Sequence, residues 1–396
     1  MNRILQIKNI KDAEAELKKI NVSSGGVAAM ASKAMVLAIK LTGVKLGAAN
    51  ILKQEMLSLG GDAAVARGVV EGKIPVSDVI LLGDRKRIKK LIAKLEHQSI
   101  FGLTAIKYDL ERLISLYFDE QKILKMNQKE ILLNEVKIIG ILNVTPDSFS
   151  DGNEYLDPEA AFARAEEMIN EGVDIIDIGG ESTRPGAEGV SVDEELRRVI
   201  PVIKQIRANY DIPISIDTTK SAVAEAALQT GADLINDVSA LRFDEKMIQI
   251  LQKNEKIPVI LMHMQGKPRT MQKAPQYQDV IEEILEFFDE RINVCLNAGI
   301  SLDRILIDPG IGFGKRQQDN LEILKKISEF KCLGRPVVLG ASRKSFINRI
   351  YESEAFERLE GSLATSALAF HQGIDLVRVH DVKAHKRLIK TLSAIG

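Results

Sequence analysis

The sequence predicts a (β/α)8 barrel that extends from Lys137 to the C-terminus. Eight short apolar runs recur in this region, and each has the length and the Val/Ile/Leu content of a strand that is buried on both faces. Stretches of helical pattern separate the runs, and a barrel of this kind takes about 250 residues. The runs are KIIGILNVT (137–145), DIIDIGG (174–180), PISIDT (213–218), LINDVSA (234–240), PVILMHM (258–264), RILIDPG (304–310), PVVLGAS (336–342) and LVRVHD (376–381).

Polar residues at the ends of these runs predict where the chemistry takes place. In a (β/α)8 barrel the carboxyl ends of the strands line one mouth, and the active site lies there. An open, doubly wound sheet is the alternative topology for the same alternation of strands and helices. The residues that we expect at the mouth are Asn143, Glu181, Thr183, Arg184, Asp217, Asn236, His263, Asp308, Lys344, Arg378, His380 and Asp381.

The 396 residues are enough for two domains, and charge divides them unevenly. Residues 1–136 carry a net charge of +7 and residues 137–396 a net charge of −8. We therefore predict a small α+β domain over 1–128, a polar connector over 129–136 and the barrel over 137–396. Within the first domain we expect strands at 3–10 and 77–84 and helices at 29–59, 84–94 and 108–117.

Two features of the N-terminal region allow a functional and a structural interpretation. The Ser-Ser-Gly-Gly turn at 23–26 could hold an anion at a helix N-terminus, but such a turn more often caps the helix. The basic run at 84–90 could bind phosphate, but it also fits a solvated helix face. We favour the structural interpretation of both.

Composition and patterning narrow the class of protein. The net charge of −1 argues against a general nucleic-acid binder. Cys295 and Cys332 lack the spacing of metal ligands and are expected to be inert thiols. The first residues carry charges throughout, unlike a signal peptide, and no run approaches the roughly 20 apolar residues of a membrane span. These patterns predict a cytoplasmic protein with no membrane partner.

Two glycine-containing segments supply groups for a metal and an anion. Residues 140–152 read G-I-L-N-V-T-P-D-S-F-S-D-G, and Asn143 and Asp151 are oxygen ligands of the kind that Mg²⁺ accepts alongside substrate phosphates. An Asx-rich turn explains the same residues equally well. Residues 179–187 read G-G-E-S-T-R-P-G-A, and this loop places Arg184 at the mouth, where it suits an anionic group.

Further strand ends predict a pocket for a planar ligand and for an anion. Asp217, Asn236 and Asp308 can pair with an N–H/NH2 edge of the kind that pterins and purines present, although either aspartate could instead cap the following helix. Residues 342–345 lie after strand seven, where barrels often bind phosphate. Arg378 and His380 project to the same side of strand eight and can hold one anion together.

These segments resemble dihydropteroate synthase. The resemblance rests on the two glycine-containing segments and on S-I-D-T, L-M-H-M-Q-G, D-P-G-I-G-F-G-K, G-A-S-R-K-S and R-V-H-D, in the family's order from Lys137 to the end. It does not cover the N-terminal region. The resemblance implies a Mg²⁺-dependent enzyme, usually a homodimer, that condenses 6-hydroxymethyl-7,8-dihydropterin diphosphate with 4-aminobenzoate. The products are 7,8-dihydropteroate and pyrophosphate.

The resemblance also implies roles for individual residues. Pterin contacts are expected from Asp217, Asn236, Met262, Asp308 and Lys344. Diphosphate contacts are expected from Arg378 and His380, with Asn143 and Asp151 at the metal. The aminobenzoate is expected between Thr183, Arg184, Pro185, Phe313 and Ser342. Direct parts in catalysis are expected for Asp147, Asp151, Arg184 and Lys344.

Two other functions fit parts of the sequence. A pterin-dependent methyltransferase acting with a corrinoid protein would share the Asp/Asn pocket, but it would not need the anion-binding residues on strand eight or the S-T-R-P and S-R-K-S segments. A binding protein with an inactive barrel would not need the full set of polar strand ends. We therefore expect the synthase.

Overall fold

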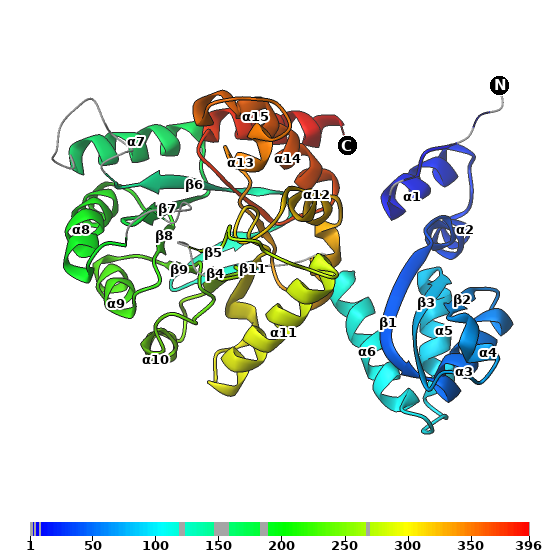
Figure 1. The fold of residues 1–396 in the computed structure, drawn as a ribbon. Helices are drawn as coiled ribbons and strands as arrows, with labels where there is room; N and C mark the ends of the chain where they lie inside the picture. The colour runs from blue at the N-terminus through cyan, green and yellow to red at the C-terminus, as the bar shows by residue number, and fades with distance from the viewer. Residues whose placement is uncertain are drawn as a thin grey trace. The chain divides into compact units, whose positions relative to one another are not determined.

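The computed structural model describes residues 3, 5–7, 9–118, 123–145, 158–182, 189–266 and 270–395. The chain divides into two compact units, Met1–Phe118 and Asp119–Gly396 (Figure 1). This division falls earlier than the boundary near residue 128 that the sequence predicts. Within the described residues, no helix has the length and apolar content needed to cross a membrane.

The N-terminal unit combines an antiparallel sheet with helices, as predicted for an α+β domain. The strands are ordered β1-β3-β2, and one face of the sheet contributes to a core shared with the helices. The strands and helices are β1 (Leu37–Lys45), β2 (Asp62–Val65), β3 (Val76–Gly83), α1 (Ile10–Lys19), α2 (Ser24–Met30), the 3-10 helix η1 (Ala31–Ala34), α3 (Leu46–Ser58), α4 (Arg67–Val70), α5 (Arg85–Leu95) and α6 (Leu103–Tyr117).

Two predicted elements of this unit are wrong. The described residues of 3–10 form no strand; instead Asn9 caps helix α1 by accepting a hydrogen bond from the Asp12 backbone N–H. The range 29–59 is not one helix, because it contains β1 before α3. Gly43 interrupts the pairing of β1 with β3 at a φ of +64°, a conformation that favours glycine. Ser23 caps helix α2 through the Gly26 N–H, as the structural interpretation predicts.

The second unit confirms the (β/α)8 barrel and excludes the open sheet. Its parallel strands are ordered β11-β10-β9-β8-β7-β6-β13-β12, and a bridge from Ile307 to Val337 joins the two ends into a closed ring. The eight strands are β6 (Lys137–Asn143), β7 (Ile175–Gly179), β8 (Ile214–Asp217), β9 (Leu234–Asp237), β10 (Val259–Met262), β11 (Ile305–Asp308), β12 (Val338–Leu339) and β13 (Leu376–Val379).

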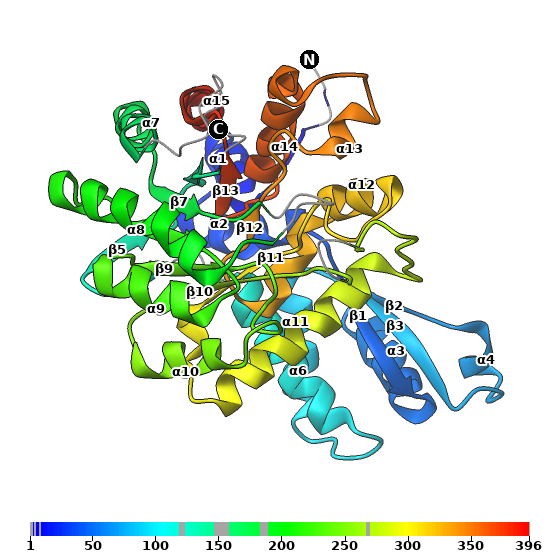
Figure 2. The same ribbon diagram turned by 60° about the vertical axis from the view of Figure 1, so that its left-hand side comes forward.

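Helices surround the barrel strands, as Figure 2 shows for α8 to α11. Their apolar sides pack on the outward-facing strand residues and form the largest core of the molecule. The helices of this unit are α7 (Pro158–Glu171), α8 (Val192–Asn209), α9 (Ser221–Thr230), α10 (Lys246–Lys253), α11 (Val280–Asn297), α12 (Gln317–Lys325), α13 (Ser345–Asn348), α14 (Leu359–His371) and α15 (Val382–Ile395), with short 3-10 helices η3 (Leu302–Arg304), η4 (Ile327–Leu333) and η5 (Ala355–Glu357).

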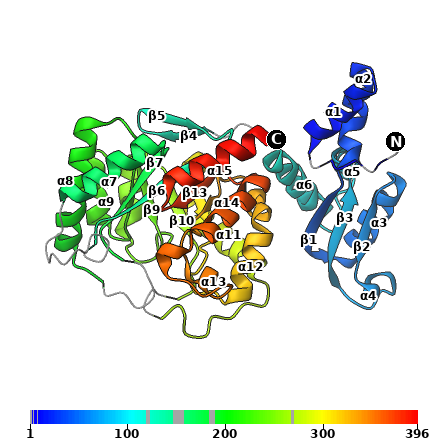
Figure 3. The same ribbon diagram turned by 90° about the horizontal axis from the view of Figure 1, so that it is seen from above.

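A β-hairpin closes the end of the barrel at which the strands begin. Strands β4 (Ile123–Met126) and β5 (Lys129–Leu132) form it, and it lies along one end of the barrel in Figure 3. Leu124, Met126 and Leu133 pack against a layer of inward-facing residues. That layer is Ile139, Ile175, Leu234, Ile260, Leu306, Val338 and Leu376. The predicted polar connector at 129–136 is therefore corrected, because it contains β5 and its Leu133 packs against the barrel.

The opposite end of the barrel is polar, because strand alternation carries polar residues inward. Side chains two positions further along a strand point to the same side. Asp177, Asn236, Asp308 and Arg378 each follow a residue of the apolar layer at this spacing. The barrel interior thus changes from apolar to polar and charged over two residues along these strands.

Candidate active site

A pocket of about 470 Å³ opens where the barrel strands end. Every described residue to which the resemblance assigns a role lines it, as does Glu181, whereas His263 and Asp381, also predicted at the mouth, do not. The residues with an assigned role are Asn143, Asp217, Asn236, Met262, Asp308, Phe313, Ser342, Lys344, Arg378 and His380. The other predicted site residues, Asp147, Asp151, Thr183, Arg184 and Pro185, lie outside the described residues.

One row of neighbouring strand residues forms part of the pocket. Asn143, Gly179, Asp217 and Asn236 are successive partners across β6, β7, β8 and β9. A side chain at Gly179 would lie 3.8 Å from Asn143 Oδ1 and 3.5 Å from Asp217 Cβ. The glycine therefore keeps space open between an amide oxygen and a carboxylate.

Ion pairs join three charged groups from three strands at the site. Arg378 Nε donates to Asp177 Oδ2 at 2.6 Å, and its Nη2 donates to Asp217 Oδ2 at 2.7 Å. Burial raises the pKa of Asp217 to about 7, although the Arg378 guanidinium opposes the shift. The second oxygen of Asp217 is buried and has no hydrogen-bond partner among the described residues, so it is suited to accept from a ligand N–H.

Asp308 and Lys344 lie on another side of the pocket. Asp308 Oδ1 accepts a hydrogen bond from the Gly310 N–H at 2.7 Å, and burial raises the pKa of this carboxyl. Lys344 Nζ donates to the Ile311 carbonyl and lies 4.5 Å from the centre of the Phe313 ring. Burial lowers the pKa of Lys344 to about 8, with the charge of Asp308 opposing the shift.

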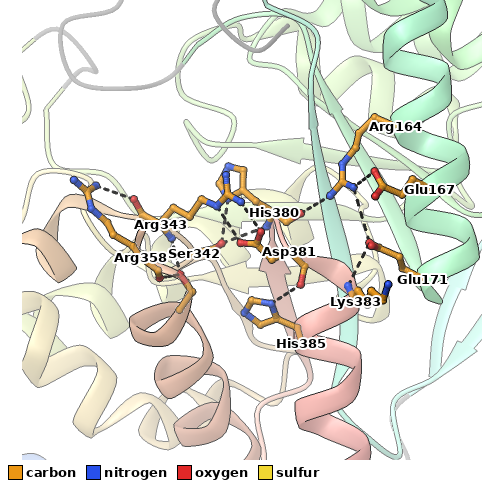
Figure 4. Close-up of polar contacts among 11 residues, drawn as sticks. Arg164, Glu167, Glu171, Ser342, Arg343, Arg358, His380, Asp381, Lys383 and His385 are labelled. Atoms are coloured by element: carbon orange, nitrogen blue, oxygen red, sulfur yellow. Dashed lines mark hydrogen bonds and ion pairs between the residues drawn. The ribbon is translucent and has the colours of Figure 1, made fainter. Parts of the chain in front are cut away.

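The segment after β12 brings Ser342 and Lys344 into the pocket together. Arg343, between them, has a φ of +57°, which reverses the chain locally. Its guanidinium pairs with Asp381, and its N–H donates to Ser362 Oγ at 2.9 Å. Figure 4 shows the pairing of Arg343 with Asp381. Asp381, which the sequence places at the mouth, instead holds this turn because strand alternation directs it away from His380.

Hydrogen-bonding contacts hold both the side chain and the backbone of His380. Its Nδ1 lies 3.1 Å from Ser342 Oγ, and its carbonyl accepts from Arg164 Nη2 at 2.8 Å (Figure 4). Ser342 thus contacts the anion-binding residue predicted on strand eight. The imidazole remains part of the pocket wall.

His263 does not line the pocket, and its predicted place at the mouth is wrong. Its Nδ1 lies 2.9 Å from the amine of Lys315, which is 1% exposed. Lys315 also donates to the Phe313 carbonyl at 3.0 Å. Burial lowers the pKa of both groups well below their ordinary values. The pair joins the loops after β10 and β11 beneath the site.

An apolar wall completes the pocket. Met262 packs with Val238, Met264, Met271 and Phe313 in a small separate cluster. Thioether and aromatic side chains of this kind suit the face of a flat ring. Polar groups at the edges and an apolar face together favour a planar heterocycle as the ligand.

Asn143 is the predicted metal ligand that the structure describes, and Asp151 lies outside the described residues. Among the described residues, no group of three or more His, Cys, Asp or Glu side chains is placed to hold a metal. Asn143 lies in the pocket beside the space at Gly179, and Mg²⁺ commonly binds one or two protein oxygens together with substrate phosphates. The donors present fit that mode of binding.

A model of the family described as "Pterin binding enzyme" matches residues 139–380, which is most of the barrel. The chain belongs to this family of pterin-binding enzymes. The dihydropteroate synthase of Synechocystis is 46% identical over 259 residues, which cover 65% of this chain and 89% of that protein. The resemblance inferred from the motifs is thereby confirmed.

The solved structures include close relatives from the pterin-binding enzyme family. The Xanthomonas albilineans dihydropteroate synthase with 4-aminobenzoic acid is 43% identical, with a TM-score of 0.66 over 69% of this chain and 98% of that one. A Haloferax volcanii protein is 36% identical over 95% of this chain, and it is named a probable bifunctional folylpolyglutamate synthase/dihydropteroate synthase. This chain spans 45% of its length. The match extends into the N-terminal unit.

Sequence reasoning missed Asp177 in this member of the pterin-binding enzyme family. Asp177 lies within an otherwise apolar strand, two positions after Ile175, and it was assigned to a strand without a role. The signal was available, since an acidic residue in a strand buried on both faces needs partners inside the barrel. The sequence does not reveal which side chains those partners are.

Proposed function

We propose that this chain is a dihydropteroate synthase of folate biosynthesis. It condenses 6-hydroxymethyl-7,8-dihydropterin diphosphate with 4-aminobenzoate to give 7,8-dihydropteroate and pyrophosphate. The observation that carries the proposal is the convergence in one pocket of Asp217, Asn236, Asp308 and Lys344 with Arg378 and His380. The first four suit a pterin ring, and the last two suit an anion attached to it.

The pterin binds by its polar edges and by one face. Asp217 and Asp308 accept from ring and amino N–H groups, Asn236 adds a further hydrogen bond, and Lys344 donates to a ring acceptor. Met262 packs on the ring face. The buried carboxylates also favour positive charge that develops on the pterin methylene group when the diphosphate leaves.

The diphosphate lies toward the opening of the pocket. His380 and Nη1 of Arg378 bind its oxygens, and Asn143, with Asp151, would hold Mg²⁺. When bound, the metal supplies charge neutralisation for the leaving group. Separation of the carbon–oxygen bond then passes the electron pair to the diphosphate.

The aminobenzoate binds nearest the solvent. Thr183, Arg184, Pro185, Phe313 and Ser342 frame it. The aromatic amine is already a nucleophile, so it needs correct placement more than a strong base. Asp147 and Asp151, on the segment after β6, and Arg184 complete the catalytic groups together with Lys344.

The reaction itself tests the proposal. Protein incubated with the pterin diphosphate, 4-aminobenzoate and Mg²⁺ should release pyrophosphate and form 7,8-dihydropteroate in equal amounts. Omission of 4-aminobenzoate should abolish dihydropteroate formation. Methyl transfer from a methylated folate to a corrinoid protein, without the condensation, would support the methyltransferase in place of the synthase.

Cellular location and oligomeric state are also part of this proposal. We propose that the enzyme acts in the cytoplasm as a homodimer, as the resemblance to its family implies. Analytical ultracentrifugation tests the second point, since a single species of 43.7 kDa would contradict it.

A further inference from the structure

Asp177 is a fully buried carboxylate that contacts two side chains of the pocket. It is the middle residue of β7 and is 0% exposed. Asp177 does not itself belong to the pocket wall that the described residues form. Its hydrogen bonds can therefore affect a ligand only through the side chains that it contacts.

Its contacts come from two other strands. Asp177 Oδ2 accepts a hydrogen bond from Asn236 Nδ2 at 3.0 Å and another from Arg378 Nε at 2.6 Å. Asn236 lies on β9 and Arg378 on β13, and both line the pocket. A buried charge without partners is unfavourable, so the carboxylate and its two donors fix one another.

The first contact determines the orientation of the Asn236 amide. An ionised carboxylate only accepts hydrogen bonds, so the NH2 group of Asn236 must face Asp177. The carbonyl oxygen of that amide is thereby directed away from Asp177 and is left to the pocket. Without the carboxylate, the amide could present either its oxygen or its NH2 group to a ligand.

The second contact determines the plane of the guanidinium. Asp177 holds Nε of Arg378 while Asp217 holds Nη2 at 2.7 Å. Among the described residues, Nη1 makes no hydrogen bond. A planar group held at two positions has one orientation, and its remaining nitrogen keeps a fixed place.

We propose that Asp177 is a positioning residue for the pterin and its diphosphate. It presents the Asn236 oxygen as an acceptor for a pterin N–H group and holds Arg378 so that Nη1 meets the diphosphate. The proposal rests on the proposed function for the identity of the ligand. The orientation that it assigns to Asn236 and Arg378 concerns this chain alone.

Three variants test the proposal by calorimetric titration with 6-hydroxymethyl-7,8-dihydropterin. Asp177→Leu keeps the bulk but removes the acceptor, and affinity should fall roughly ten- to a hundredfold. Asp177→Asn should stay within about threefold of the wild type, because its amide oxygen can take the place of Oδ2. Ser215→Ala is the matched control, since Ser215 is also buried on the neighbouring strand but has no hydrogen-bond partner among the described residues.

A double-mutant cycle with Asn236→Ala separates positioning from a merely structural role. If Asp177 acts through Asn236, Asp177→Leu should cost much less affinity once the amide is gone, with a coupling of about fivefold or more. Independent losses would overturn the proposal, and so would an Asp177→Asn variant as weak as Asp177→Leu. Thermal melts check folding, and Asp177→Ala replaces the leucine variant in the cycle if leucine does not fit.

The wild type and the Asp177→Leu variant together distinguish failure of the proposed function from failure of the role proposed for Asp177. A wild type that binds the pterin but forms no dihydropteroate contradicts the proposed function and leaves the orientation testable. A wild type that forms dihydropteroate, with an Asp177→Leu variant of unchanged pterin affinity, contradicts the role of Asp177 alone.

Discussion

At individual residues of the site, burial and neighbouring charges shift the pKa in opposite directions. Asp217 is buried beside Arg378, and its pKa of about 7 reflects a carboxyl that is deprived of water but close to a guanidinium. Lys344 is a buried amine close to a carboxylate: burial lowers its pKa to about 8, and the charge of Asp308 opposes the shift. Neither buried group can obtain enough hydrogen bonds from water, so a ligand has to provide them. A single substitution at either position should therefore change ligand affinity.

Asp217→Asn should weaken pterin binding without unfolding the protein. The variant replaces an acceptor oxygen by an NH2 donor, so one hydrogen bond to the pterin becomes an opposition of two donors. An unsatisfied buried polar group costs about 1–3 kcal/mol, and affinity should fall roughly tenfold to a few hundredfold. Calorimetric titration measures the affinity. Wild-type affinity in a folded variant would exclude Asp217 from the pterin site.

The same substitution should change how stability depends on pH. The pKa of Asp217 is raised on folding from 3.8 to about 7, so between these values the folded protein holds a proton that the unfolded chain has released. Stability of the wild type therefore falls as pH rises through this window. Thermal melts should show Asp217→Asn gaining on the wild type by on the order of 2 kcal/mol between pH 5 and pH 7. A constant difference would contradict the raised pKa.

Arg378→Ala should affect the diphosphate and the pterin differently. Loss of the guanidinium should weaken pyrophosphate binding at every pH. It should also raise the pKa of Asp217 further, because Arg378 opposes that shift. Binding of a non-phosphorylated pterin should then be weaker at neutral pH and recover as the pH rises. His380→Ala is the control, and it should lower pyrophosphate affinity without this pH dependence.

At the scale of elements, the loops after the strands shape the pocket. The loop after β11 contains three glycines with positive φ, Gly310, Gly312 and Gly314. A side chain at Gly310 would lie 2.0 Å from the His263 carbonyl oxygen, so this loop packs directly on the one after β10. Lys315 then joins the two loops from below.

Gly310→Ala should therefore destabilise the barrel and displace Phe313. The clash is with backbone, which cannot move aside, so a loss of about 3 kcal/mol or more is expected. Gly299→Ala is a matched control, because Gly299 has a similar φ of +79° but open space around it. That variant should lose only about 1 kcal/mol. Chemical denaturation compares the two, and equal losses would show that the contact with His263 is unimportant.

At the scale of the whole molecule, the barrel and the N-terminal unit form separate cores. The hairpin β4–β5 belongs with the barrel, where Lys129 Nζ also donates to Asp233 Oδ2 at 3.1 Å. The N-terminal unit also has a counterpart in another protein, since the match to the Haloferax relative covers 95% of the whole chain. Removal of the N-terminal unit therefore tests whether the barrel is active by itself.

A chain shortened to begin at Asp119 should fold and retain the condensation. A chain that begins at Asn127 lacks β4, and so loses Leu124 and Met126 from the barrel's closed end. Loss of two buried apolar side chains should lower stability by about 4 kcal/mol or more. Thermal melts and the pyrophosphate assay compare the two chains. Inactivity of a well-folded chain from Asp119 would show that the N-terminal unit takes part in activity.

The sequence by itself determined the barrel and most of the described pocket. Buried parallel strands have a distinctive length and composition, and their carboxyl ends meet at one mouth, so Asp217, Asn236 and Asp308 could be assigned to one site. It failed where a local pattern has two outcomes, as for the segment that contains β1 and α3 and for the hairpin at 123–132.

Only the tertiary structure decided which polar groups pair inside the barrel. Asp177 and Arg378 are 201 positions apart, and Asp177 and Asn236 are 59 apart. These contacts depend on the stagger of the strands around the closed ring, which sets the height of each side chain relative to the next. Strand alternation predicts that a side chain points inward, but the closure of the barrel selects its partner.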